Sequence, residues 1–80
     1  MRRIVAVKTN DDWTLEVSFS SNEVLFFDVK PLLACEAFAP LQDLAEFKRL
    51  RNGGYYVEWE SGADLSGDTL FLDGRPSIGG

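Results

Sequence analysis

The closing segment VEWESGADLSGDTLF, residues Val57 to Phe71, groups acidic side chains in a way that suggests a cation site. Three carboxylates fall close together, at Glu60, Asp64 and Asp68. Calcium loops need acidic or amide side chains at the first, third and fifth positions, Gly at the sixth and a bidentate Glu at the twelfth. In a loop that begins at Asp64, Gly67 stands at position four and Arg75 at position twelve. Because a cation replaces the bidentate acid, the pattern does not predict a metal site.

Turn formation and helix capping explain the same side chains more simply. Asp64 follows a Gly-Ala step that suits a chain reversal, and Ser66 with Asp68 is typical of the first turn of a helix. Glu58 and Glu60 form another acidic pair, about 7 Å apart on one strand face, a spacing that glycosidic acid–base chemistry can use. An exposed polar strand face gives the same pattern, and an 80-residue domain has little depth for a substrate cleft. We therefore favour the exposed face.

The remaining reactive residues also argue against catalysis. The chain contains no histidine, which removes the commonest general base, the Ser–His and Cys–His pairs and zinc sites of Cys/His type. The single cysteine, Cys35, has no activating neighbour in the sequence and is predicted to be a small apolar filler. The chain contains both serine and lysine, so a catalytic Ser–Lys pair remains possible, but nothing in the sequence places a lysine beside a serine. We expect a protein that is not an enzyme and that uses no metal or cofactor.

The charge of the chain restricts its partners. The net charge is −5, which on average repels duplex DNA and anionic lipid and favours a basic partner protein. Solubility alone also explains the same excess of acidic side chains. No apolar run approaches the ~20 residues that span a bilayer, and the run after Arg2–Arg3 is too short for a signal peptide. We expect a cytoplasmic protein.

Two features are candidates for an interaction surface. Tyr56 is predicted on the polar face of its strand, and exposed tyrosine is typical of protein interfaces. A basic cluster follows the predicted helix, at Lys48, Arg49 and Arg51. This cluster fits a solvated helix edge as well as an interaction patch, and the sequence leaves both open. An aromatic platform for single-stranded nucleic acid would need a basic track beside its rings, which the aromatic strands lack.

The first third of the chain predicts an antiparallel meander. The stretch WTLEVSF alternates strictly, and its apolar face consists of Trp13, Leu15, Val17 and Phe19. Strands are also expected at residues 3–9 and 24–28, with polar turns between them. Because VLFFD at 24–28 is apolar on both faces, it predicts a central or doubly covered strand.

The middle of the chain is predicted to be helical. Asp28 can cap a short helix that runs through Leu33. The strongest helix follows Pro40, where Asp43 and Glu46 have the spacing of a capping box. Its apolar stripe recurs at three-residue steps, at Leu41, Leu44, Phe47 and Leu50.

The last part of the chain leaves one alternative open. Gly53–Gly54 either ends the helix or turns a hairpin, and in the second case residues 49–52 form a strand. YYVEW at 55–59 is predicted as the final strand, followed by a short helix that Ser66 caps and that returns Leu70 to the core.

Together these elements predict an α+β domain over residues 1–73. We expect an antiparallel sheet of four to five strands, begun by the three-stranded meander, with two to three short helices packed on one face. Residues 74–80, GRPSIGG, are expected to form a flexible tail.

Three stretches carry a family resemblance: IVAVKTNDDWTLEVSFSSNEVLFFDVKPLL, FAPLQDLAEFKRL and VEWESGADLSGDTLF. They resemble the bacterial domain-of-unknown-function family 2442. That family has a hairpin, an Asp that ends the third strand, a helix with Leu and Phe, and then Trp-x-x-Gly-x-Asp-Leu. The matching positions are Asp28, Leu41, Phe47, Trp59, Gly62, Asp64 and Leu65. The closing motif is the most specific part.

The resemblance implies a small α+β fold without an assigned enzyme activity, in which the motif positions determine the fold. It also implies a gene paired with that of another small protein, as in toxin–antitoxin arrangements. Some relatives carry a helix-turn-helix segment after this domain. We see no such segment here, so direct nucleic-acid binding is not expected.

We therefore expect a protein–protein interaction module, antitoxin-like, whose partner is the product of the adjacent gene, a basic toxin-like protein. One alternative is a DNA-associated regulatory module that acts through a partner or as a dimer. A small-ligand-binding domain is another. If an exposed sheet face is apolar, a homodimer through that face or through an edge strand is expected.

Overall fold

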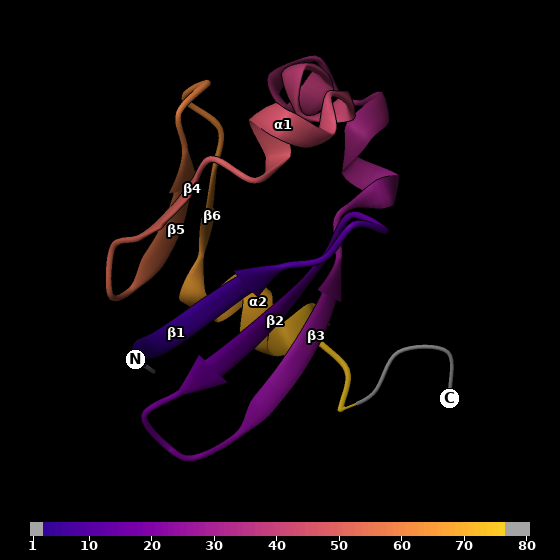
Figure 1. Cartoon of the computed structure of the whole chain (residues 1–80). Coiled ribbons are helices and arrows are strands. Elements are labelled where there is room, and N and C mark those ends of the chain that lie inside the picture. The colour runs from indigo at the N-terminus through magenta and orange to yellow at the C-terminus, as the bar shows by residue number, and fades with distance from the viewer. Residues whose placement is uncertain (1–2, 77–80) are drawn as a thin grey trace.

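Two three-stranded antiparallel sheets form the framework of the protein in a computed structural model that describes residues 3–76 (Figure 1). Sheet A has the order β1-β2-β3 and consists of β1 (Ile4–Thr9), β2 (Thr14–Phe19) and β3 (Val24–Asp28). Sheet B has the order β4-β5-β6 and consists of β4 (Leu50–Asn52), β5 (Tyr56–Trp59) and β6 (Asp64–Ser66).

Short helices connect and cover the sheets. Between β3 and β4 the chain forms two 3-10 helices, η1 (Lys30–Ala34) and η2 (Glu36–Gln42), and one α-helical turn, α1 (Leu44–Phe47). Helix α2 (Gly67–Asp73) follows β6 and lies behind sheet A in Figure 1. The α+β class is confirmed.

The prediction of a single sheet of four to five strands is wrong. Hydrogen bonds join the two sheets at the start of β1, where the Ile4 N–H donates to the Gly54 carbonyl (2.6 Å) and the Asn52 side-chain amide donates to the Ile4 carbonyl (3.0 Å). The register of β1 against β2 shifts between Ile4 and Ala6. Such a bulge bends and twists an edge strand, so a continuous ladder from β1 to β4 does not form.

Strand β3 lies at the edge of sheet A, and β2 is central, so the predicted central position of β3 is wrong. Apolar residues occur on both of its faces for a different reason. Phe27 is buried in the core, whereas the backbone of Phe26 pairs with Arg75 through two hydrogen bonds of 2.7 and 2.8 Å. The predicted tail thus begins with residues that reach the edge of β3, and residues 77–80 lie outside the described residues.

Three turns share one hydrogen-bond pattern, those of residues 10–14, 19–23 and 59–63. In each, the first N–H donates to the carbonyl four residues later, and the fourth N–H donates back to the first carbonyl. The fourth residue has positive φ: 62° at Trp13, 70° at Asn22 and 101° at Gly62. The turn positions agree with the sequence prediction. Trp13, however, lies in the turn and not in the strand.

The helix predicted after Pro40 is mostly absent, because its three-residue spacing fits a 3-10 helix of three residues per turn equally well. Leu41 lies in η2, and Leu50 lies in β4, so the hairpin alternative at Gly53–Gly54 is the one observed. The Asp43 carboxylate accepts the Ala45 N–H (3.0 Å) and caps α1. The Asp43 N–H itself donates to Pro40, so the reciprocal half of the capping box is not formed.

The core lies between the inner faces of the two sheets and the helices. Phe47 and Trp59 stack with ring centroids 6.1 Å apart, and the Trp59 indole N–H donates to the Phe47 carbonyl (2.8 Å). Leu70 returns to this core from α2, which Ser66 caps as predicted. Cys35, in contrast, is exposed and is not an apolar filler.

Candidate functional site

The outer face of sheet B brings together side chains that the sequence singled out. In β5, Val57 and Trp59 point into the core, so the alternating residues point outward. Arg51 pairs in register with Glu58, and Glu58 pairs with Asp64, while Tyr56 pairs with Ser66. We call this surface the charged sheet face; it consists of Arg51, Tyr56, Glu58, Asp64 and Ser66.

Tyr56 packs against the hairpin turn on the charged sheet face. Tyr56 is 46% exposed, and its ring lies over Gly53 on the opposite side of the hairpin. A Cβ at Gly53 would lie 2.3 Å from the Cζ atom of that ring, so a larger residue at position 53 would require the Tyr56 ring to move. The Gly53 N–H also donates to the Tyr56 carbonyl (2.8 Å). The tyrosine is therefore half-exposed on a hydrogen-bonded hairpin.

The charges on this face do not balance. Arg51 Nη2 donates to Glu58 Oε1 at 2.8 Å, which neutralises both groups locally. Asp64 is exposed and forms no hydrogen bond or ion pair with the residues that the structure describes. The face therefore carries one acidic side chain in excess beside Tyr56.

The predicted basic cluster does not form a single patch. Lys48 pairs with Asp11 (2.7 Å), Arg49 pairs with Glu46 (3.6 Å), and Arg51 pairs with Glu58. These pairs are solvent-exposed, so each contributes little to stability. They nevertheless place an acid beside every cation of the cluster, which lowers the local positive potential. Of the three cations, Arg51 is the one on the charged sheet face with Tyr56.

The family-motif positions divide into core, turn and surface. Phe47 and Trp59 are fully buried, and Leu65 packs against the core from β6. Gly62 supplies the positive φ of the third turn. Asp64 lies after that turn, as the first residue of β6. Within residues 3–76 the Asp64 side chain forms no hydrogen bond or ion pair, so it stabilises the fold by neither.

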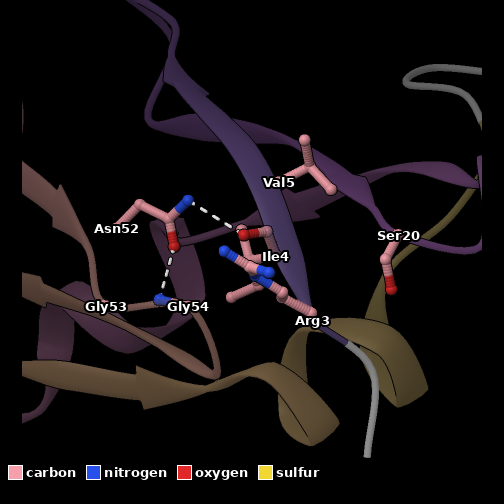
Figure 2. Close-up of a pocket in the computed structure, with 7 residues that line it drawn as sticks. All are labelled: Arg3, Ile4, Val5, Ser20, Asn52, Gly53 and Gly54. Carbon is pink, nitrogen blue, oxygen red and sulfur yellow. Dashed lines mark hydrogen bonds between the residues drawn. The ribbon is translucent and has the colours of Figure 1, made fainter.

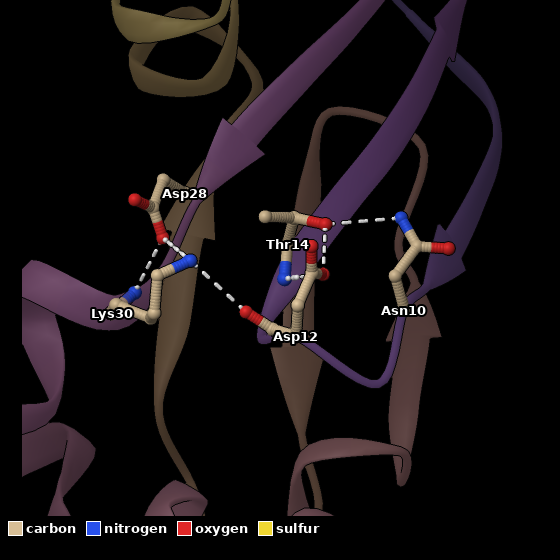
Figure 3. A network of polar contacts seen from close by, with 5 residues as sticks. All are labelled: Asn10, Asp12, Thr14, Asp28 and Lys30. Atoms are coloured by element: carbon tan, nitrogen blue, oxygen red, sulfur yellow. Dashed lines mark hydrogen bonds and ion pairs between the residues drawn. The ribbon is translucent and has the colours of Figure 1, made fainter. Parts of the chain in front are cut away.

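Asp28 belongs to a polar network that joins the first turn to η1 (Figure 3). Its carboxylate accepts the Lys30 N–H and pairs with Lys30 Nζ, both at 3.0 Å. Lys30 Nζ also donates to the Asp12 carbonyl (3.1 Å). The Thr14 hydroxyl donates to Asp12 Oδ1 (2.6 Å) and accepts from the Asn10 amide (3.1 Å).

The Thr14 hydroxyl has the largest effect on the pKa of Asp12 in this network. Its hydrogen bond holds the pKa of the Asp12 carboxyl below the ordinary value of 3.8, and the charge of Lys30 contributes less. Thr14 is only 2% exposed, although the strand pattern predicted a polar outer face there. Because its members satisfy one another, the network positions η1 and offers little to a ligand.

An open cavity of about 530 Å³ lies where the two sheets meet (Figure 2). Its lining consists of Arg3, Ile4, Val5, Ser20, Asn52, Gly53 and Gly54. The Asn52 side chain crosses it, donating to the Ile4 carbonyl and accepting the Gly54 N–H (2.8 Å). Sequence reasoning missed this site because it arises from segments about fifty residues apart; the Asn-Gly-Gly run signalled only a turn.

Residues 3–76 hold neither a cluster of metal ligands nor a helix that could cross a membrane. No group of three or more His, Cys, Asp or Glu residues is placed to hold a metal ion. No helix there has the length and apolar character needed to cross a membrane.

The family described as "Protein of unknown function (DUF2442)" matches residues 4–75, nearly the whole chain. The chain belongs to this family. No curated protein and no solved structure matched it. Membership of the DUF2442 family confirms the resemblance seen in the sequence.

Proposed function

We propose that the protein is a cytoplasmic, non-enzymatic protein-interaction module, antitoxin-like, that binds a basic partner protein through the charged sheet face. One observation carries the proposal: Tyr56 and the unpaired Asp64 share an exposed face whose register is set by the hairpins of sheet B. The partner we propose is the product of the adjacent gene.

Tyr56 has the properties of an interface anchor. Tyrosine supplies a large contact area with only two side-chain torsions, so little conformational entropy is lost on binding. The ring also packs against Gly53, which favours one orientation before a partner arrives. Preorganisation of this kind increases affinity without adding contacts.

The charge favours a basic protein over a nucleic acid. The chain carries a net charge of −5, and Asp64 adds an uncompensated acid next to Tyr56. Complementary potential accelerates encounter with a basic surface and disfavours phosphate backbones. The pairing of Lys48, Arg49 and Arg51 with acids supports the same choice, because a DNA-binding module needs a continuous basic track.

Co-purification with the product of the adjacent gene tests the proposal. We expect a complex, and we expect Tyr56→Ala to weaken it about tenfold or more, as truncation of an interface anchor does. Asp64→Lys is expected to slow association with a basic partner. Both variants should keep the melting temperature of the parent within a few degrees.

The chain offers a matched control for each variant. Tyr55→Ala removes an exposed tyrosine that lies outside β5, and Glu36→Lys makes the same type of charge reversal on η2. Both should bind like the parent chain. A monomer that ignores its neighbour's product, or a complex insensitive to Tyr56→Ala and Asp64→Lys, would contradict the proposal.

A further inference from the structure

The outer face of sheet A is a second exposed sheet surface, distinct from the charged sheet face. Register places its side chains in rows across the three strands, with Ala6, Ser18 and Val24 in one row and Lys8, Glu16 and Phe26 in the next. We call these six residues the open face. In Figure 1, α2 lies behind sheet A, and no described helix or strand covers the front.

The β3 side of the open face is apolar. Val24 is 44% exposed, and Phe26 is half-buried between its neighbours on the face. Leu25 and Phe27, on either side of Phe26, pack inward with the core, but Phe26 does not join that cluster. A single half-buried apolar side chain is common on protein surfaces, so the charges that flank Phe26 are the more informative feature.

Opposite charges lie on the two sides of Phe26. Glu16 is its register partner on β2, and Arg75 is its backbone partner beyond the edge of β3. Paired residues on neighbouring antiparallel strands project to the same face of a sheet. Glu16, Phe26 and Arg75 therefore form a row with about 4.8 Å between neighbouring backbone segments. Within residues 3–76, neither Glu16 nor Arg75 takes part in an ion pair.

We infer that a second copy of the chain covers the β3 side of the open face and forms an isologous dimer with Phe26 at the two-fold axis. An axis parallel to the strands exchanges the two sides of the row. Phe26 then meets its own copy, and Glu16 lies opposite Arg75 of the partner subunit. An anion and a cation on opposite sides of an apolar residue make this row self-complementary.

The size of the face sets the expected strength of the dimer. Because the axis lies over the edge strand β3, only β2, β3 and the Arg75 segment of each copy overlap. They bury an area at the low end of specific interfaces, below about 1,200 Å² in total, which is typical of reversible association. We therefore expect a micromolar dimer that dissociates on dilution. This inference uses a different surface from the proposed partner site and stands independently of it.

Sedimentation velocity of the full chain, from about 5 to 500 µM, tests the dimer directly. The parent chain should pass from monomer to dimer across this range. Phe26→Thr should stay monomeric throughout, while its circular dichroism matches that of the parent because threonine suits a strand. Tyr56→Ala should dimerise like the parent, because it changes the other face.

Charge reversal tests the arrangement within the dimer. Glu16→Lys alone and Arg75→Glu alone place like charges opposite each other, and each should weaken the dimer about tenfold. An equimolar mixture of these two variants should form a heterodimer, and the double variant should dimerise like the parent. A parent chain that stays monomeric over the whole range would overturn the inference. So would a dimer insensitive to Phe26→Thr, or single reversals that no mixing restores.

Discussion

The turns at residues 10–14 and 19–23 have the same pattern of backbone hydrogen bonds but are stabilised in different ways. Both need a left-handed residue at the fourth position, which disfavours most side chains by about 1–2 kcal/mol. The second turn uses Asn22, a residue that tolerates this conformation. The first turn uses Trp13, which is bulky and unsuited to it.

Tertiary contacts hold Trp13 in this conformation. Its indole N–H donates to the Leu41 carbonyl (2.7 Å), and its own carbonyl accepts the Val29 N–H (2.9 Å). Its ring lies 6.4 Å from that of Phe47. In the second turn, the Ser20 N–H donates to the Arg3 carbonyl (2.8 Å) and the Ser21 hydroxyl donates to the Glu23 carboxylate (2.9 Å), and neither bond involves the left-handed residue Asn22. The comparison separates a turn formed by local preference from one imposed by packing.

The largest expected effect comes from Trp13. Trp13→Ala should lower the free energy of unfolding by about 3 kcal/mol, because it removes packing and keeps the backbone strain. Trp13→Gly should cost about 1 kcal/mol less than Trp13→Ala, because glycine adopts positive φ freely. Urea unfolding of the two variants measures the difference. A glycine variant less stable than the alanine variant would show that the conformation carries no strain.

A smaller effect is expected from the buried hydroxyl of the first turn. Thr14→Val removes the hydrogen bonds to Asp12 and from Asn10, and should cost about 1.5 kcal/mol. Ser21→Ala removes the exposed hydroxyl of the second turn and should change stability by less than about 0.5 kcal/mol. Thermal unfolding measures the loss of stability in both variants. Equal losses would contradict the difference drawn between the two turns.

Asn22 provides the inverse of the Trp13 test. Asn22→Ala should cost about 1 kcal/mol through positive φ alone, and Asn22→Gly should be close to neutral. Chemical denaturation again gives the values. If Asn22→Gly were as destabilising as Asn22→Ala, a side-chain contact and not the backbone would hold the second turn.

The smallest expected effect is a pH dependence confined to the first turn. The folded-state pKa of Asp12 lies below the ordinary value of 3.8. Its contribution to stability is therefore fully present above the unfolded pKa and is lost as the pH falls through the folded one. Carboxyl titration by NMR should place Asp12 below 3.8 in the parent chain and nearer to it in Thr14→Val. An unchanged titration in that variant would contradict the assigned cause.

Local pattern predicted much of the fold. Period-two alternation located β2, and the Ser66 cap located α2, since both signals depend on neighbouring residues. The division into two sheets depends on Ile4 meeting Asn52, which no local pattern contains. Strand β6 was missed because three residues after a turn show no periodicity.

The candidate site was predictable only in part. The outward position of Tyr56 followed from alternation within its own strand. The dispersal of Lys48, Arg49 and Arg51 did not, because each pairs with an acid that the fold brings near. The row of Arg51, Glu58 and Asp64 required the register of three strands.

The two edges of sheet A have a consequence for synthesis of the chain. Gly54 binds the β1 edge at Ile4, and Arg75 binds the β3 edge at Phe26. During translation, the meander leaves the ribosome well before either of these residues. Both edges then stay unpaired until the second half of the chain emerges, and open edges template association between chains. A chain interrupted before Arg75 should therefore aggregate more readily than the finished one.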